Sequence, residues 1–120
     1  MKTSVDLLIS ISDLFDKLGG QEKPLDELSR KILLQVAHSR VDKRPIKVTD
    51  VAQMIKDTSH PTLYGRLRAL AAMGLLAETS SPEDGRVTLL SLTPKAQSQL
   101  RSIAREIVRA SRAYAPNKPL

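Results

Sequence analysis

Few side chains in this sequence are of the kinds that perform covalent chemistry. There are two histidines, His38 and His60, and no cysteine, which excludes thiolate nucleophiles, disulfides and cysteine metal sites. The histidines do not form a His-x-x-x-His or Glu-x-x-His ligand pair. Asp13 and Asp16 share one face of a predicted helix, but such surface carboxylates are usually only solvated. We therefore expect no enzyme and no bound metal or cofactor.

The chemistry that the sequence does offer is recognition of anions by basic side chains. The net charge is +6, with a net of −3 over residues 1–29 and +9 over the rest. Such asymmetry is typical of a chain whose later part meets a polyanion. Ordinary solvated charge gives the same totals, so the charge balance alone does not separate the two interpretations.

One arginine stands at a tight turn between two apolar runs. The segment Pro82-Glu83-Asp84-Gly85 is predicted to reverse the chain, with Gly85 free to adopt a positive φ. Asp84 can accept hydrogen bonds from the turn amides or hold the guanidinium of Arg86. The turn is either a solubilising hairpin tip or a finger that carries Arg86 to a target.

A second group of candidates lies on a predicted helix over residues 59–74. At 100° per residue, Leu63, Leu67, Leu70 and Gly74 share the side that we expect to pack on the preceding helix and the hairpin. The opposite side carries one charge and several small residues: Pro61, Thr62, Gly65, Arg68 and Ala72, with Tyr64 and Ala69 at its edges. Gly65 costs the helix about 1 kcal/mol relative to alanine. Small residues would let this helix enter a DNA major groove, or pack against another protein helix.

The residue types suggest a specific role for some of these candidates and leave two roles open for others. Arg68 would reach a guanine edge or a phosphate. Arg66 lies nearer the buried side and suits a phosphate contact or an internal ion pair equally. Ser59 is explained by helix capping alone, whereas His60 contacts phosphate or only supports the first turn. The complete candidate DNA-binding set is Ser59, His60, Pro61, Thr62, Tyr64, Gly65, Arg66, Arg68, Asp84 and Arg86.

The elements that must position these residues follow from periodicity and capping signals. Helices are predicted over residues 3–20, 23–43, 49–57, 59–74 and 94–114, with an extended piece at 46–48 and strands at 75–80 and 86–93. Expected helix starts are Pro24 in the first position of the second helix, Thr49 and Ser59 as caps, and Thr93-Pro94 at the last helix. Two short helices followed by a hairpin indicate a winged helix-turn-helix. The fold class is mainly α with a small β-hairpin (α+β).

The terminal helices carry matching apolar seams. Their residues recur at spacings of four and three: Leu7, Ile11, Leu14 and Leu18 in the first helix, and Leu100, Ile103, Ile107, Ala110 and Tyr114 in the last. We expect an isologous homodimer because a lone subunit would expose this apolar surface. The predicted plan is a single domain, 1–120, with dimerisation helices at 1–22 and 94–114, a DNA-binding part at 24–93 and a frayed tail at 115–120.

A stripe of arginines lies opposite the seam of the last helix. Its members are Arg101, Arg105, Arg109 and Arg112. In a dimer of this shape the seam is expected to lie away from DNA. Pairing with Asp6, Asp13 and Asp16 of the first helix is therefore favoured over phosphate binding.

The segment 47–100 resembles the MarR family of bacterial transcription regulators. The resemblance rests on the Ser-started helix, Leu70-Ala71-Ala72-Met73-Gly74-Leu75, Asp84-Gly85-Arg86 and Leu92-Thr93, in that order. It implies a homodimer on palindromic double-stranded DNA, usually as a repressor, with Arg86 in the minor groove and release by a small, often aromatic and acidic effector. No segment approaches the 18 or so apolar residues of a membrane span, so we expect a cytoplasmic protein. The alternative is a winged-helix interaction subunit of a larger assembly that does not read DNA.

Overall fold

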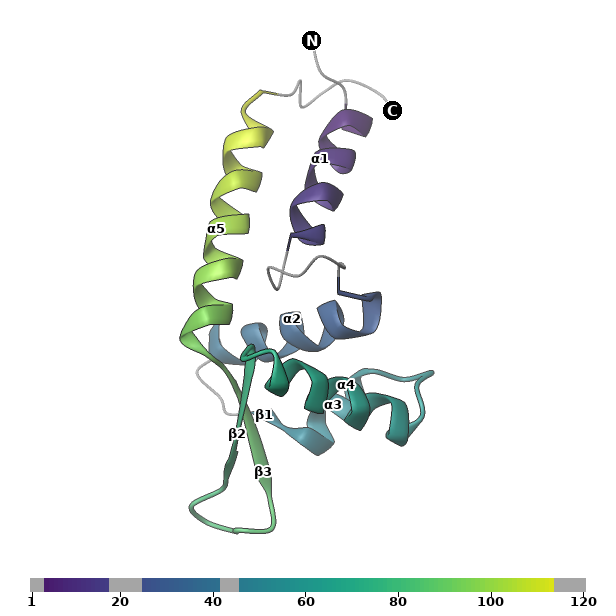
Figure 1. The fold of residues 1–120 in the computed structure, drawn as a ribbon, viewed down its shortest axis with the longest axis vertical. Helices are drawn as coiled ribbons and strands as arrows, with labels where there is room; N and C mark the ends of the chain where they lie inside the picture. The colour runs from purple at the N-terminus through teal and green to yellow at the C-terminus, as the bar shows by residue number, and fades with distance from the viewer. Residues whose placement is uncertain (1–3, 18–24, 42–45, 114–120) are drawn as a thin grey trace. The chain divides into compact units, whose positions relative to one another are not determined.

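The computed structural model describes residues 4–17, 25–41 and 46–113. Its elements, in chain order, are α1 (Ser4–Asp16), α2 (Glu27–Val41), β1 (Ile46–Lys47), α3 (Val48–Met54), α4 (His60–Ala72), β2 (Leu76–Ser80), β3 (Thr88–Leu92) and α5 (Pro94–Ser111), as Figure 1 shows. The chain divides into two compact units, one of residues 26–96 and one of residues 1–25 with 97–120. The fold is mainly α with a small antiparallel sheet, as predicted.

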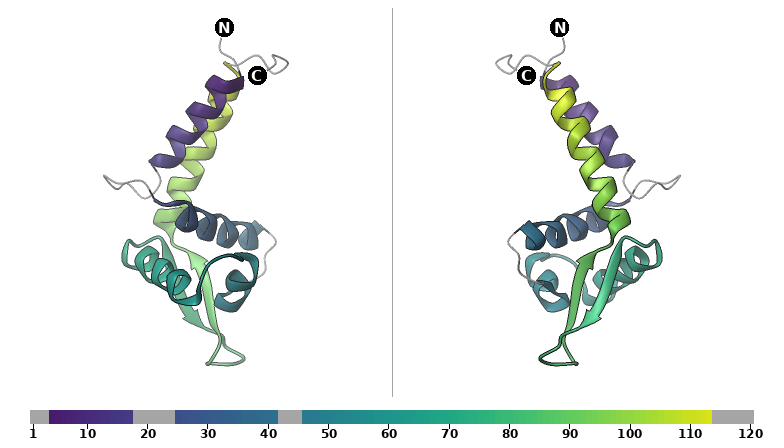
Figure 2. Two further views of the ribbon diagram at one scale, coloured as in Figure 1. Left: turned by 90° about the vertical axis from the view of Figure 1, so that its right-hand side faces the viewer. Right: turned by 90° about the vertical axis from the view of Figure 1, so that its left-hand side faces the viewer.

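The sheet of the first unit has three strands in the order β1-β3-β2. β2 and β3 form the predicted hairpin, with Leu76 opposite Leu92 and Ser80 opposite Thr88. The extended piece at Ile46 pairs with the other edge of β3, where Ile46 lies opposite Leu90 and both side chains are buried. The hairpin extends beyond the helices of its unit (Figures 1 and 2).

The core of this unit is aliphatic, as the composition predicts. Its largest fully buried side chains come from α2, α3, α4 and the residue before β2: Ile32, Leu33, Val36, Val51, Leu63, Leu67, Leu70 and Leu75. α4 packs mainly on α2 and β2. The contact with β2 confirms the expected packing on the hairpin, whereas the main helix partner of α4 is α2 and not the expected α3.

Two helix starts differ from the sequence prediction. α2 begins at Glu27, after Asp26, whose Oδ1 accepts a hydrogen bond from the Ser29 backbone N–H (2.9 Å). Asp26 thus caps a helix that was expected to begin at Pro24, which lies outside the described residues. α3 begins at Val48, and the Asp50 carboxylate accepts from the Lys47 N–H (2.9 Å). Thr49 lies inside this helix and is not its cap, because Asp50 satisfies the free amide one turn earlier.

The predicted signals at the ends of α4 and at the start of α5 are confirmed. Gly74 adopts φ of 76°, which ends α4 at little steric cost. The Thr93 hydroxyl accepts from the Ala96 N–H (3.2 Å) and donates to the Gly74 carbonyl (2.5 Å). Pro94 then occupies the first position of α5. Thr93 therefore both caps α5 and joins its start to the end of α4.

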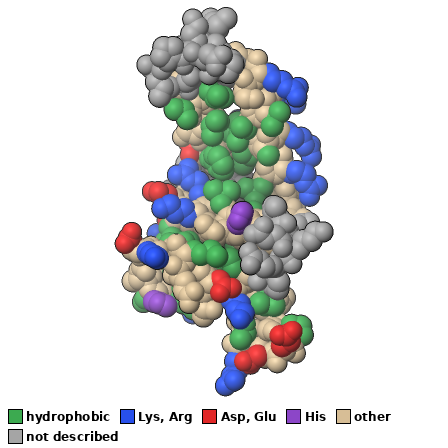
Figure 3. All heavy atoms as spheres, turned by 180° about the vertical axis from the view of Figure 1, so that it is seen from behind, with side chains coloured by type: hydrophobic (Ala, Val, Ile, Leu, Met, Phe, Trp, Pro, Cys, Tyr) green, Lys and Arg blue, Asp and Glu red, His purple; other side chains and the backbone are tan. Residues whose placement is uncertain are grey.

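The second unit consists of α1 and most of α5, which lie beside each other (Figure 1). Ile103 of the predicted seam is buried, and the other described seam residues are half-buried: Leu7, Ile11, Leu14, Leu100, Ile107 and Ala110. Leu18, Tyr114 and the tail 115–120 lie outside the described residues. Val5, Leu8, Ile9 and Val108 stay exposed, and Figure 3 shows hydrophobic side chains gathered over α1 and α5. No described helix is long and apolar enough to cross a membrane.

Candidate nucleic-acid interface

The outer side of α4 is exposed and made of small residues. Leu63, Leu67 and Leu70 are at most 2% exposed on the inner side. The exposed residues of the helix are His60, Pro61, Thr62, Gly65, Arg68, Ala69 and Ala72. A Cβ built on Gly65 would meet no atom within 4 Å. The glycine is therefore not required by packing within the described chain.

The first turn of α4 is capped as predicted. Ser59 has an extended backbone, and its Oγ accepts from the Thr62 N–H (3.3 Å) and contacts the Thr62 hydroxyl (2.9 Å). These two hydrogen bonds account for Ser59 without a ligand. Pro61 stands in the first turn, where its missing N–H costs nothing.

The structure brings two candidates together that sequence reasoning treated separately. The rings of His60 and Tyr64 stack with their centroids 6.1 Å apart and their planes at 20°. The two residues are one helical turn apart, and Arg68 follows after another turn. His60, Tyr64 and Arg68 therefore form one row along α4, with two flat rings followed by an exposed cation.

Arg66 lies across the small-residue face from the row of His60, Tyr64 and Arg68, and it forms an ion pair. Its Nε donates to Oδ2 of Asp26 at 2.6 Å, and the two side chains are 42% and 46% exposed. The internal ion pair that the sequence left open is thus present. Desolvation raises the pKa of the Asp26 carboxyl, but hydrogen bonds from Ser29 and the ion pair with Arg66 outweigh it and lower the pKa overall. The sequence signal for Asp26 was only an acid near a helix start.

The hairpin ends in a β-turn that presents Arg86. The Val87 N–H donates to the Asp84 carbonyl (2.9 Å), and Oδ1 of Asp84 accepts from both the backbone N–H (3.0 Å) and Nε (3.3 Å) of Arg86. These hydrogen bonds lower the pKa of Asp84. The Arg86 side chain is 92% exposed. Both roles predicted for Asp84 are therefore present together.

The prediction of a positive φ at Gly85 was wrong. Among the described glycines, Gly74 alone has a positive φ. The turn from Asp84 to Val87 is closed by its i to i+3 hydrogen bond and by the Asp84 side chain. Such a turn accepts negative φ at both central positions, so glycine is not needed there for its conformation.

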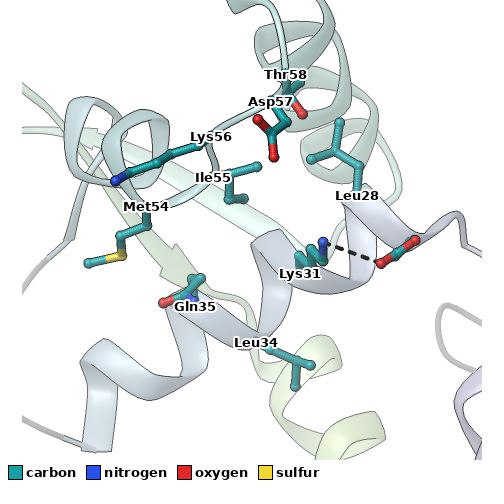
Figure 4. A pocket seen from close by; sticks show the side chains of 10 residues that line it. Leu28, Lys31, Leu34, Gln35, Met54, Ile55, Lys56, Asp57 and Thr58 are labelled. Carbon is teal, nitrogen blue, oxygen red and sulfur yellow. Dashed lines mark ion pairs between the residues drawn. The ribbon is translucent and has the colours of Figure 1, made fainter.

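A cavity of about 650 Å³ lies between α2 and the end of α3 (Figure 4). Its apolar lining comes from Leu28, Leu34, Met54 and Ile55, and its polar lining from Glu27, Lys31, Gln35, Lys56, Asp57 and Thr58. Lys31 is paired with Glu27 (3.2 Å). None of these residues belongs to the outer face of α4 or to the wing tip.

The arginine stripe of α5 makes an ion pair within its own helix. Among the described residues, its ion pair joins Arg109 to Glu106 of the same helix (2.9 Å) and involves none of the acids of α1. An open surface hollow runs along this face and is lined by Arg101, Ala104, Arg105, Val108, Arg109 and Arg112. The predicted pairing with Asp6, Asp13 and Asp16 stays a prediction for the dimer.

The described residues hold no group of three or more His, Cys, Asp or Glu side chains that could bind a metal ion. The candidate interface instead has an arginine–aspartate pair beside α4 and another at the wing tip. Such pairs fix a guanidinium in orientation and leave donors for an anion, since arginine carries five N–H groups.

Comparisons with known proteins agree with this geometry. A family model described as a winged helix DNA-binding domain matches residues 25–96. A structure of MarR is 20% identical over 88% of this chain and 72% of that chain, with a TM-score of 0.61. A mutant of MepR from a multidrug-resistant S. aureus clinical isolate is 15% identical over 92% and 73%, with a TM-score of 0.69. The adhesin competence repressor of Streptococcus pyogenes is 21% identical over 91% and 74%, with a TM-score of 0.56. No curated protein matches the sequence. The predicted MarR-like fold is confirmed.

Proposed function

We propose that this chain, which belongs to the family of winged helix DNA-binding domains, is a transcriptional regulator that binds palindromic DNA as a homodimer. α4 enters the major groove, and the β2–β3 hairpin reaches the minor groove through Arg86. The proposal assigns no catalytic step to any residue and places the protein in the cytoplasm.

The observation that carries this proposal is the exposed face of α4. A solvated helix usually carries several charges on its outer side, but this one exposes Pro61, Thr62, Gly65, Ala69 and Ala72. Small side chains allow the helix backbone to approach the base edges closely. Arg68 then stands where a bidentate contact to guanine is possible.

The wing supports the same orientation. Arg86 is almost fully exposed at the turn, and Asp84 fixes both its backbone and its Nε. An arginine held outward at the end of a two-stranded projection suits the narrow minor groove, where the electrostatic potential is most negative.

The dimer is proposed from the surface of the second unit. Val5, Leu8, Ile9 and Val108 are 45–58% exposed on α1 and α5. A second copy of this chain would bury them by a two-fold contact of the same surfaces. Two winged units would then face two half-sites about one helical turn apart, 10–10.5 base pairs.

Gel shifts with fragmented genomic DNA test the DNA proposal. The chain should retain a subset of fragments against excess bulk competitor, and affinity should fall steeply between 50 and 200 mM salt because phosphate contacts release counterions. Sequencing the retained fragments would show a palindrome if two subunits bind together. Failure to retain any fragment, with capture of a tight protein partner instead, would favour the interaction-subunit alternative.

Repression and its relief complete the proposal. A promoter fused to the selected site should be less active when the chain is present. The cavity beside α2 has the volume of a small-molecule site, and Lys56 offers a cation to an acidic effector. Benzoate and related aromatic acids should then release the labelled duplex. An unchanged complex would remove these acids from the proposal and leave DNA binding in place.

A further inference from the structure

The ion pair between Asp26 and Arg66 joins two elements that are far apart in sequence. Forty positions separate the residues, and one carboxylate oxygen lies 2.6 Å from the Arg66 Nε. The other oxygen accepts a hydrogen bond from the Ser29 N–H and so caps the start of α2. Asp26 therefore anchors the first helix of the winged unit and, through its second oxygen, a side chain of α4.

Arg66 and Arg68 lie on opposite shoulders of the small-residue face. Positions two apart on a helix are separated by about 200°. Arg68 follows the row of His60 and Tyr64, while Arg66 stands on the side of Thr62 and Ala69. A helix lying in the major groove passes between two phosphate backbones, so the shoulder that carries Arg66 faces one of them, while Arg68 lies nearer the base edges.

The pairing leaves Arg66 able to take a second anion. Asp26 occupies the Nε edge, and a guanidinium has four further N–H donors on its two terminal nitrogens. The side chain is 42% exposed, so these donors are not sealed in the core. Asp26 restricts the rotamers of a long side chain before any ligand arrives, which reduces the entropy lost when a phosphate binds.

We infer that Asp26 is a positioning residue for DNA binding, which holds Arg66 so that its terminal nitrogens contact a backbone phosphate beside the major groove. This inference rests on the proposed function and adds a residue outside the helix-turn-helix and the wing. It predicts a change in DNA affinity opposite to the one that net charge alone would give. Removal of an acidic charge near DNA should strengthen binding by simple electrostatics, whereas removal of this one should weaken it.

The substitution Asp26→Asn tests whether loss of this carboxylate weakens or strengthens DNA binding. Asparagine caps helices about as well as aspartate, so the start of α2 is retained. Asp57→Asn is the matched control, because it removes the same charge from an exposed site in the same unit. Asp57 has φ of 62°, a conformation that asparagine also tolerates. Circular dichroism and the thermal midpoint establish that both variants are folded.

The probe is a fluorescein-labelled duplex selected from genomic fragments by the wild-type chain, with affinity measured by anisotropy from 50 to 200 mM salt. We expect Asp26→Asn to weaken binding about threefold to tenfold and to flatten the salt dependence, since a charge-assisted contact loses its fixed geometry. Asp57→Asn should bind as tightly as wild type or tighter. Arg66→Ala should lower the salt slope by about one.

The double variant separates positioning from a structural role. In the Arg66→Ala background, Asp26→Asn should no longer weaken binding, because the side chain that it positions is absent. Binding by Asp26→Asn equal to or tighter than wild type would overturn the inference and show that Asp26 competes with DNA for Arg66. An equal loss with and without Arg66 would also overturn it. If the wild-type chain selects no duplex at all, the proposed function itself fails.

Discussion

At the scale of single residues, the arginines of the candidate interface differ in how they are held. Arg86 is fixed by Asp84, two positions earlier in the same turn. Arg66 is fixed by Asp26 on another element, and Arg68 is exposed after the stacked rings of His60 and Tyr64. Arginines held by a carboxylate present a defined edge to an anion, and this gives each its own expected mutational effect.

Arg86→Ala should lower DNA affinity and leave the thermal midpoint unchanged. The side chain is 92% exposed, so its removal opens no cavity, and an exposed pair adds little to stability. Arg112→Ala on α5 is the control, since it removes the same charge from another exposed position. Anisotropy titrations and thermal melts would check both variants. Equal affinities of Arg86→Ala and wild type would refute the placement of the wing in the minor groove.

The lowered pKa of Asp26 predicts a pH dependence of stability. Because the folded-state pKa lies below its ordinary value of 3.8, the carboxylate stabilises the fold above that value. This stabilisation is lost as the pH falls through the folded-state pKa. Urea unfolding between pH 6 and 2.5 should therefore show a larger loss of unfolding free energy for wild type than for Asp26→Asn. Parallel curves for the two proteins would contradict this assignment.

At the scale of elements, α4 has well-defined capping and termination residues but a helix-destabilising glycine in its middle. Ser59 caps the first turn, and Gly74 with φ of 76° ends the last. Gly65 stands between them with open space around its missing side chain. A glycine that costs helix stability and is not required for packing within the described residues supports the proposed close approach of α4 to DNA.

Gly65→Ala should stabilise the protein and weaken DNA binding at the same time. Alanine adds about 0.5–1 kcal/mol of helix stability, while its methyl group would stand between the backbone and the base edges. Chemical unfolding and anisotropy would measure the two effects. Thr62→Ala serves as a comparison that keeps a small side chain on the same face. Tighter or unchanged DNA binding by Gly65→Ala would argue against a close approach of α4.

At the scale of the whole molecule, the two units have different packing. Residues 26–96 enclose a core of fully buried aliphatic side chains. The unit of α1 and α5 has one seam residue that is buried, Ile103, and leaves large hydrophobic side chains exposed. A surface of this kind is characteristic of an association site, and the dimer proposal depends on it.

Leu8→Asp should convert the dimer to a monomer without unfolding the winged unit. Leu8 is 58% exposed in one subunit, so an aspartate there is tolerated in the monomer but would be buried unpaired in the dimer. Sedimentation velocity at micromolar concentration would report the oligomeric state. Gln53→Asp, which adds the same charge at an exposed position of α3, should remain dimeric. A wild-type chain that sediments as a monomer would refute the dimer directly.

The sequence by itself determined the order of the helices and strands and most of the residues that cap or end them. Local chemistry decides these features: Ser59 and Thr93 cap, Gly74 ends a helix, and the leucine spacing of α4 selects its buried side. For the same reason, the sequence alone predicts the exposed small-residue face of α4 and the exposed wing arginine. The positive φ at Gly85 and the cap at Thr49 were wrong, because a nearby aspartate satisfied each turn instead.

The tertiary structure decided the contacts between residues distant in sequence. It placed β1 on the edge of β3, packed α4 on α2, and brought Asp26 to Arg66 across forty positions. Periodicity fixes which face of a helix is apolar, but not which other element covers it. That choice depends on the summed burial of all the elements, which no local spacing contains.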